Sequence, residues 1–98
     1  MKIKLVDFGG EFCTSRKSPA IEKLREVIEK SIQSNTPIEI LRDGVKVLTP
    51  SFIDELLPPL VIQYGEEQVM GIISFLPPLD GYLKEQLHRG VAARRKSQ

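Results

Sequence analysis

The sequence predicts one small α/β domain, in which helices connect the strands of a mostly parallel or mixed sheet. Short apolar runs suited to strands alternate with segments whose apolar residues recur at helical spacing. Two hydroxyl-proline pairs, Ser18-Pro19 and Thr49-Pro50, mark helix starts after such runs. Strands that alternate with helices pair in parallel through right-handed crossovers. We therefore expect about four strands and about three helices, in a single domain that covers residues 1–98.

The composition is that of an ordinary globular protein, with 41% apolar and 28% charged residues. The net charge of +1 gives no electrostatic preference for any class of partner. A single cysteine, Cys13, excludes an internal disulfide and a cysteine-based metal cluster, and it fits a reducing compartment. No stretch resembles a signal peptide or a membrane span, so we expect a cytoplasmic protein with no membrane association.

The N-terminal part of the chain contains the first strand and the first helix. Residues 2–8 alternate as in a strand, which a Gly-Gly turn signal ends. Residues 11–14 either return as a second short strand, which would make a hairpin with the first, or form a loop, and the pattern leaves both open. A helix begins after the N-cap Ser18, and we place a short strand at residues 38–41 in the centre of the sheet. The apolar stripe of this helix consists of Ile21, Leu24, Val27, Ile28 and Ile32.

The middle of the chain leads from a turn into a second helix. Asp43-Gly44 is a turn signal, because glycine tolerates a positive φ and aspartate can bond its own backbone. An apolar run over residues 45–48 follows. Thr49 then occupies the N-cap, and Pro50 takes the first helical position, where a missing N–H has no consequence.

This second helix is amphipathic but interrupted. A Pro-Pro pair at residues 58–59 removes two backbone donors, so we expect a helix over residues 50–57 and a kink or fresh start beyond it. Asp54 and Glu55 lie in the first turn or so, where the helix dipole favours negative charge.

The C-terminal part is read as a strand and a last helix. Gly65 is a natural helix C-terminus. Residues 70–76 form a near-continuous apolar run, which predicts a strand covered on both faces. A helix then runs from about residue 79 into the nineties, and its basic end, residues 89–98, is expected to fray. Its apolar stripe consists of Leu79, Tyr82, Leu83, Leu87 and Val91.

Two loops are candidates for a functional site, since ligands of open α/β sheets bind at the carboxyl ends of strands. One loop, residues 12–18, carries Thr14, Ser15 and Arg16, and the other is residues 48–51. Together they offer hydroxyls, helix N-termini and a guanidinium, which suit a phosphate-binding or phosphoryl-regulated surface. The alternative is that the hydroxyls are structural caps and the guanidinium is solvated.

No catalytic or metal-binding constellation is visible. His88 has no second ligand type near it, and Cys13 has no histidine near it in sequence, so we expect a surface histidine and a buried structural thiol. Asp54 and Glu55 diverge by about 100° on a helix and are poorly placed to share a substrate. No nucleotide-binding fingerprint is present. We expect no cofactor, no metal and no enzymatic activity.

The C-terminal segment is basic, with no acidic residue after Glu85. Such a segment could contact nucleic-acid phosphates. It lacks interleaved aromatic residues, however, and the chain is nearly neutral, so we interpret it as a solvated helix end whose cations complement the dipole. Nucleic acid is not an expected partner. The basic residues are Arg89, Arg94, Arg95 and Lys96.

Two segments carry a resemblance to a known family: FCTSR (residues 12–16) and LTPSFIDEL (residues 48–56), within the longer stretch DGVKVLTPSFIDELLPPLVIQYG (residues 43–65). The chain resembles the STAS-like family, small bacterial domains of largely unassigned function, related in pattern to the STAS domains of anti-sigma-factor antagonists. The resemblance implies a mixed sheet with helices largely on one side.

In the antagonists, an acidic residue near a strand end precedes a hydroxyl residue at a helix N-terminus. A kinase-like anti-sigma factor phosphorylates that hydroxyl, and phosphorylation switches binding off. Here Asp43 matches the acidic position. Pro50 falls on or beside the phosphorylated position, which leaves Ser51 and Thr49 as candidate phosphoacceptors.

The resulting functional hypothesis is a non-enzymatic regulatory protein-binding module, a partner-switching signalling domain controlled by phosphorylation at the start of the second helix. The expected partner is a kinase-like ATPase or another signalling protein, with homodimer formation left open. The alternative is a small-ligand or nucleotide-sensing domain that uses the same helix N-terminal surface. Beside the two phosphoacceptors, the candidate surface consists of Asp43, Gly44, Pro50, Phe52, Asp54, Glu55, Thr14, Ser15 and Arg16.

Overall fold

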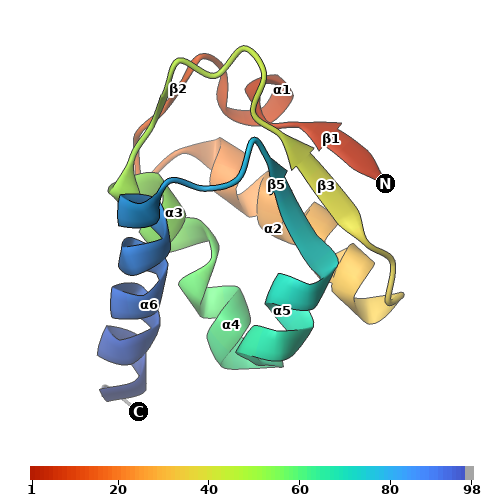
Figure 1. Cartoon of the computed structure of the whole chain (residues 1–98), viewed down its shortest axis with the longest axis vertical. Coiled ribbons are helices and arrows are strands. Elements are labelled where there is room, and N and C mark those ends of the chain that lie inside the picture. The colour runs from red at the N-terminus through yellow and green to blue at the C-terminus, as the bar shows by residue number, and fades with distance from the viewer. Residues whose placement is uncertain (97–98) are drawn as a thin grey trace.

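The computed structural model describes residues 1–96 of the chain (Figure 1). It is a small α/β domain with parallel strand pairing, as predicted, but its five strands and the helices α1 to α6 are more numerous than expected. In chain order the elements are β1 (Lys2–Lys4), α1 (Val6–Gly9), β2 (Phe12–Cys13), α2 (Pro19–Gln33), β3 (Ile38–Leu41), β4 (Val47–Leu48), α3 (Pro50–Leu56), α4 (Pro58–Tyr64), α5 (Glu66–Ile72), β5 (Ile73–Leu76) and α6 (Gly81–Lys96).

The strands form two separate parallel sheets rather than one. The larger sheet has the order β1-β3-β5, so the prediction that residues 38–41 form a central strand is confirmed. The smaller sheet pairs β2 with β4 over two residues each. Buried and more accessible residues alternate along β3 and β5, so one face of the larger sheet packs on the core.

The first strand is shorter than predicted. β1 pairs with β3 as far as Lys4 opposite Leu41, and the Leu5 N–H donates to Leu41 O at 2.9 Å. Because β3 ends there, residues 6–8 have no strand partner, and they form the short helix α1 instead. Residues 11–14 contain a strand, but not a hairpin: β2 lies parallel to β4.

The two predicted N-caps are confirmed. Ser18 Oγ accepts from the Ala20 N–H at 3.3 Å at the start of α2, and Thr49 Oγ1 accepts from the Phe52 N–H at 3.4 Å at the start of α3. In both helices proline follows the cap. Of the stripe predicted for α2, four residues are buried in the core and one is partly buried against it: Ile21, Leu24, Ile28, Ile32 and Val27.

The Pro-Pro pair acts as predicted. α3 ends at Leu56, and α4 begins at Pro58, so both prolines of the pair lie in the first turn of α4. Backbone hydrogen bonds from Leu57 N to Ile53 O and from Val61 N to Leu57 O, both 3.0 Å, connect the two helices across the junction. Gly65, at φ +92°, ends α4.

The prediction of a strand over residues 70–76, covered on both faces, is wrong. Helix α5 continues to Ile72, and only Ile73–Leu76 form a strand. Two glutamates in the first turn of α5 favour the helix there. Ser74 and Leu76 are exposed, and β5 is an edge strand of the larger sheet.

The last helix begins at Gly81, slightly later than predicted, and Tyr82 of its predicted apolar stripe is exposed. The basic segment is helical as far as Lys96, and the remainder of the predicted tail, residues 97–98, lies outside the described residues. Fraying of this end stays a prediction. Within residues 1–96, no helix has the length and apolar character needed to cross a membrane.

Candidate functional site

Two loops that are distant in sequence lie side by side where the smaller sheet ends. β2 and β4 are parallel, with Cys13 opposite Leu48, and the Thr49 N–H donates to Cys13 O at 3.1 Å. Since both strands run in the same direction, the segments that follow them emerge at one edge. The structure thus brings together residues 14–18 and 49–51, as predicted for the two candidate loops.

The hydroxyl of Thr49 is used inside the protein. It accepts the N-cap hydrogen bond from the Phe52 N–H and donates to Thr14 O at 3.1 Å. It therefore joins the start of α3 to the loop that precedes α2. Thr49 is a structural residue, and its phosphorylation would remove the hydroxyl proton that it donates to Thr14 O.

Ser51 is different. It lies at the second position of α3, is half-buried, and its hydroxyl forms no hydrogen bond with another described residue. Pro50, which precedes it, is also half-buried and supplies no N–H. Of the two phosphoacceptor candidates, Ser51 is therefore the one whose hydroxyl is not engaged in a hydrogen bond with another described residue.

Asp54 lies at the centre of an ion-pair cluster, the Asp54 clasp, formed by Asp54, Arg16 and Arg94. Arg16 Nη1 donates to Asp54 Oδ2, and Arg94 Nη1 donates to Asp54 Oδ1 at 3.1 Å. Burial by itself raises the pKa of Asp54, but hydrogen bonds from Arg16, Arg94 and Gln86 and the charge of Arg94 outweigh it and hold the pKa below its usual value. The clasp ties the loop before α2, helix α3 and helix α6 to one carboxylate.

The assignment of Asp54 and Glu55 to the helix dipole is wrong. The first turn of α3 holds no acidic residue, and both carboxylates are engaged by arginines from other elements. Nor is Arg94 a solvated residue of a helix end, since it also lies 3.8 Å from Glu55 Oε2. These partners are about forty residues apart in sequence, so no local pattern indicates them.

Gly90 is a residue that sequence reasoning missed. A Cβ atom at this position would lie 2.8 Å from Pro58 Cγ and closer still to Asp54 Oδ1. Helix α6 can therefore approach α3 and α4 closely only because residue 90 has no side chain. No local pattern in the sequence indicates this contact, because Asp54 and Pro58 lie far from Gly90 along the chain.

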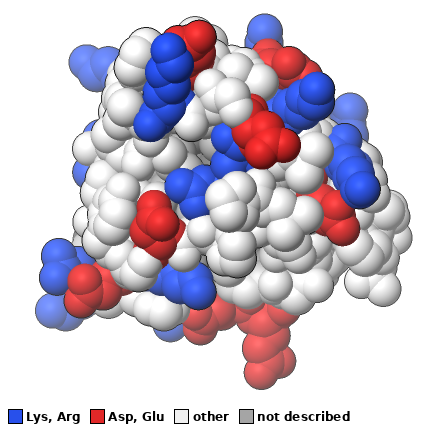
Figure 2. All heavy atoms as spheres, turned by 45° about the horizontal axis from the view of Figure 1, so that its top comes forward, with Lys and Arg blue, Asp and Glu red and all other residues white. Residues whose placement is uncertain are grey.

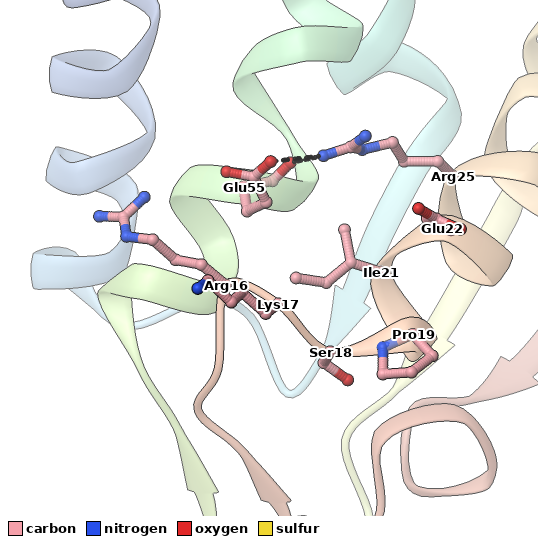
Figure 3. Close-up of a pocket in the computed structure, with 8 residues that line it drawn as sticks. All are labelled: Arg16, Lys17, Ser18, Pro19, Ile21, Glu22, Arg25 and Glu55. Carbon is pink, nitrogen blue, oxygen red and sulfur yellow. Dashed lines mark hydrogen bonds and ion pairs between the residues drawn. The ribbon is translucent and has the colours of Figure 1, made fainter.

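A hollow of about 240 Å³ lies beside the start of α2 (Figure 3). Arg25 extends to Glu55, with Nη2 donating to Glu55 Oε1 at 3.2 Å and also to the Glu55 carbonyl. Figure 3 also shows the Arg16 side chain extending away from Ile21, toward α6. Two of the three cations beside the hollow are thus already paired. Its lining consists of Arg16, Lys17, Ser18, Pro19, Ile21, Glu22, Arg25 and Glu55.

The remaining predicted surface residues divide into accessible and buried ones. Thr14 and Ser15 are exposed, and Ser15 Oγ accepts from the Lys17 N–H at 3.1 Å. Asp43 and Gly44 lie in the exposed turn between β3 and β4. Including Phe52 in a partner surface is wrong, because its side chain is fully buried in the core.

An exposed apolar pair accompanies these loops and was not predicted as part of a site. Phe12 and Val47 are paired in register across β2 and β4, and they are 60% and 41% exposed. Their neighbours Cys13 and Leu48 point inward, since side chains alternate along a strand. Figure 2 looks onto the end of the molecule that carries these strands, and there Lys and Arg stand beside Asp and Glu with uncharged surface between them.

The other chemically reactive side chains do not join the site. Burial raises the pKa of the Cys13 thiol, which is consistent with the expected structural role. His88 lies on α6, with Nε2 at 3.3 Å from Glu66 Oε1. Among residues 1–96, no group of three His, Cys, Asp or Glu side chains could hold a metal ion.

Comparisons with protein-family models, with curated proteins and with solved structures found no match for this chain. The resemblance to the STAS-like family accordingly stays a prediction, and the functional argument depends on the geometry described above.

Proposed function

We propose that this chain is a regulatory protein-binding module of STAS-like type, without enzymatic activity of its own. The docking surface would be formed by the exposed pair Phe12 and Val47 together with the loops that follow them. The single observation that carries the proposal is this apolar pair, held outward by a two-residue parallel sheet beside the candidate loops. Exposed aromatic side chains are enriched at protein–protein interfaces, and Phe12 has an apolar neighbour in Val47.

Ser51 is the proposed control point of this surface. A phosphate there would add about −1.5 to −2 charges at the beginning of α3, a helix end that tolerates anions. Asp54 and Glu55 follow three and four residues later, on the same side of the helix, and would repel it. The phosphate would compete with Asp54 for Arg16, and so alter the loop that borders the docking surface while leaving the core intact.

The proposed partner is a kinase-like ATPase or another signalling protein, and the test is quantitative affinity capture from a lysate of the native cell. The wild-type chain should recover such a protein, and Phe12→Ser and Ser51→Asp should each reduce recovery at least fivefold. Gln68→Glu, which adds a charge to the exposed side of α5, is the matched control and should behave as wild type.

Circular dichroism must show equal helix content in all four proteins for the comparison to hold. Full recovery with Phe12→Ser would refute the docking surface. Full recovery with Ser51→Asp would refute phosphorylation control while leaving the docking surface standing.

The hollow beside α2 favours a second candidate, a small-ligand or nucleotide-sensing domain. Lys17 is the lining cation that no carboxylate of residues 1–96 pairs with, and the N-terminus of α2 is adjacent. The pairing of Arg16 and Arg25 leaves little positive charge for an anion, which is why we rank this function second. A melting temperature that rises with ATP or GTP concentration would favour it.

A further inference from the structure

A second, larger hollow lies away from the proposed docking surface, between the free edge of β5 and helix α6. Its volume of about 430 Å³ falls within the roughly 300–1,000 Å³ of small-molecule sites. β5 is the edge strand on the side of the sheet nearer to α6 (Figure 1). The hollow, which we call the β5–α6 groove, is lined by Met70, Ser74, Phe75, Leu76, Pro78, Leu79, Lys84, Leu87 and His88.

Most of this lining is apolar. Phe75, Leu79 and Leu87 belong to the hydrophobic core and contribute to the groove from inside. Leu76, the last residue of β5, is 43% exposed. An occupant of the groove would bury this side chain, and apolar burial stabilises by about 25 cal/mol per Å².

The lining of the groove includes a lysine, Lys84, and a histidine, His88. Lys84 and His88 are four residues apart on α6 and so project from the same face. His88 contacts Glu66, whereas no carboxylate among the described residues pairs with Lys84. Asp80, in the loop before α6, is paired with Arg42, whose Nη2 lies 3.5 Å from its Oδ2.

We propose that the β5–α6 groove binds a soluble amphipathic carboxylate. The apolar body of the ligand would lie against Leu76, Leu79 and Leu87, and its carboxylate would pair with the Lys84 ammonium. Apolar walls with one unpaired cation at the rim suit this ligand class better than a neutral lipid or a cationic amphiphile. The proposal is independent of the docking surface around Phe12.

The test is a titration of the ¹⁵N-labelled chain with octanoate, followed by NMR chemical shifts, with 1-octanol as the uncharged probe of similar shape. Octanoate should produce saturable shifts confined to residues 70–88. Lys84→Gln should weaken octanoate about fivefold and leave octanol unchanged, since a partly exposed ion pair contributes modestly. Leu76→Asp, at an exposed position, should abolish binding of both probes. Lys23→Gln, an exposed lysine of α2, is the matched control and should change neither.

Four outcomes would overturn the proposal. One is the absence of saturable shifts with octanoate, and another is equal weakening of octanoate and octanol by Lys84→Gln. The third is a dependence of the shifts at residues 70–88 on protein concentration alone, which would place a second copy of the chain in the groove. Shifts that appear instead at Phe12 and Val47 would also contradict it.

Discussion

Replacing Asp54 by asparagine removes the negative charge from the Asp54 clasp while keeping the size of the side chain. Arg16 and Arg94 then face an amide in place of a carboxylate. Arg94 keeps its contact with the Gly90 carbonyl at 3.2 Å, so part of the arrangement survives. We expect the fold to form but to be less stable, because three elements share this one charge.

The magnitude follows from the exposure of the three side chains. The Asp54 side chain is 11% exposed, that of Arg94 30% and that of Arg16 48%. Breaking a fully buried pair costs about 3–5 kcal/mol, whereas an exposed pair contributes about 0–1 kcal/mol. The clasp lies between these cases, so we expect Asp54→Asn to lower the free energy of unfolding by about 2 kcal/mol. For a domain of this size that corresponds to a melting temperature lower by roughly 8–16 °C.

The same residue predicts a pH dependence. Because the folded-state pKa of Asp54 is lowered, its contribution to stability is present above the pKa of the unfolded chain. The contribution is lost as the pH falls through the folded-state pKa. The wild-type chain should therefore lose stability on acidification, and Asp54→Asn should lose less over the same acidic range.

Urea unfolding, followed by circular dichroism at several pH values, measures both effects. The matched control is Asp80→Asn, which removes an exposed carboxylate paired with Arg42 and should change stability by less than about 0.5 kcal/mol. If Asp54→Asn were as mild as Asp80→Asn at neutral pH, or if it kept the full acid dependence of the wild type, the account of the clasp would be refuted.

Three further tests, with five substitutions between them, probe other parts of the structure by thermal and urea unfolding. Gly90→Ala should lower the free energy of unfolding by about 2 kcal/mol, because the added methyl group overpacks the Asp54 clasp. Gly71→Ala, at an open position on α5, should raise it by about 0.5–1 kcal/mol. Equal effects of the two substitutions would contradict the close approach of α6. Thr49→Ala removes an N-cap and should lower the free energy of unfolding by about 1 kcal/mol, whereas Ser51→Ala should leave it nearly unchanged. A larger loss with Ser51→Ala than with Thr49→Ala would show that the cap is misassigned. Ser31→Ala removes a buried hydroxyl without a hydrogen-bond partner and should raise stability by about 1 kcal/mol, while a loss of stability would indicate a partner for that oxygen.

The helix starts could be predicted because their causes are local. A hydroxyl residue followed by proline satisfies an N-terminal N–H and presets φ wherever it occurs, as at Ser18 and Thr49. The break at the Pro-Pro pair and the end at Gly65 are equally local. The two candidate loops do lie side by side, because parallel strands place their following segments at one edge. Their role as a functional site stays a prediction.

Residues 70–76 show where local pattern fails. An apolar run of that length is compatible with a strand or with a buried helix, and periodicity alone does not separate the two. The run begins inside α5, and only its last four residues pair with β3. The prediction that residues 6–8 continue the first strand was wrong for a related reason, since a strand continues only as far as its partner strand does.

The α/β class, the helix boundaries set by caps and prolines, and the presence of a strand at residues 38–41 could be predicted from the sequence, because each depends on residues close together in the chain. The pairing of Asp54 with Arg16 and Arg94, the close approach of α6 to α3 at Gly90, and the outward position of Phe12 and Val47 are visible only in the folded structure. These features depend on contacts between segments about forty residues apart, and such contacts leave no periodic trace in the sequence.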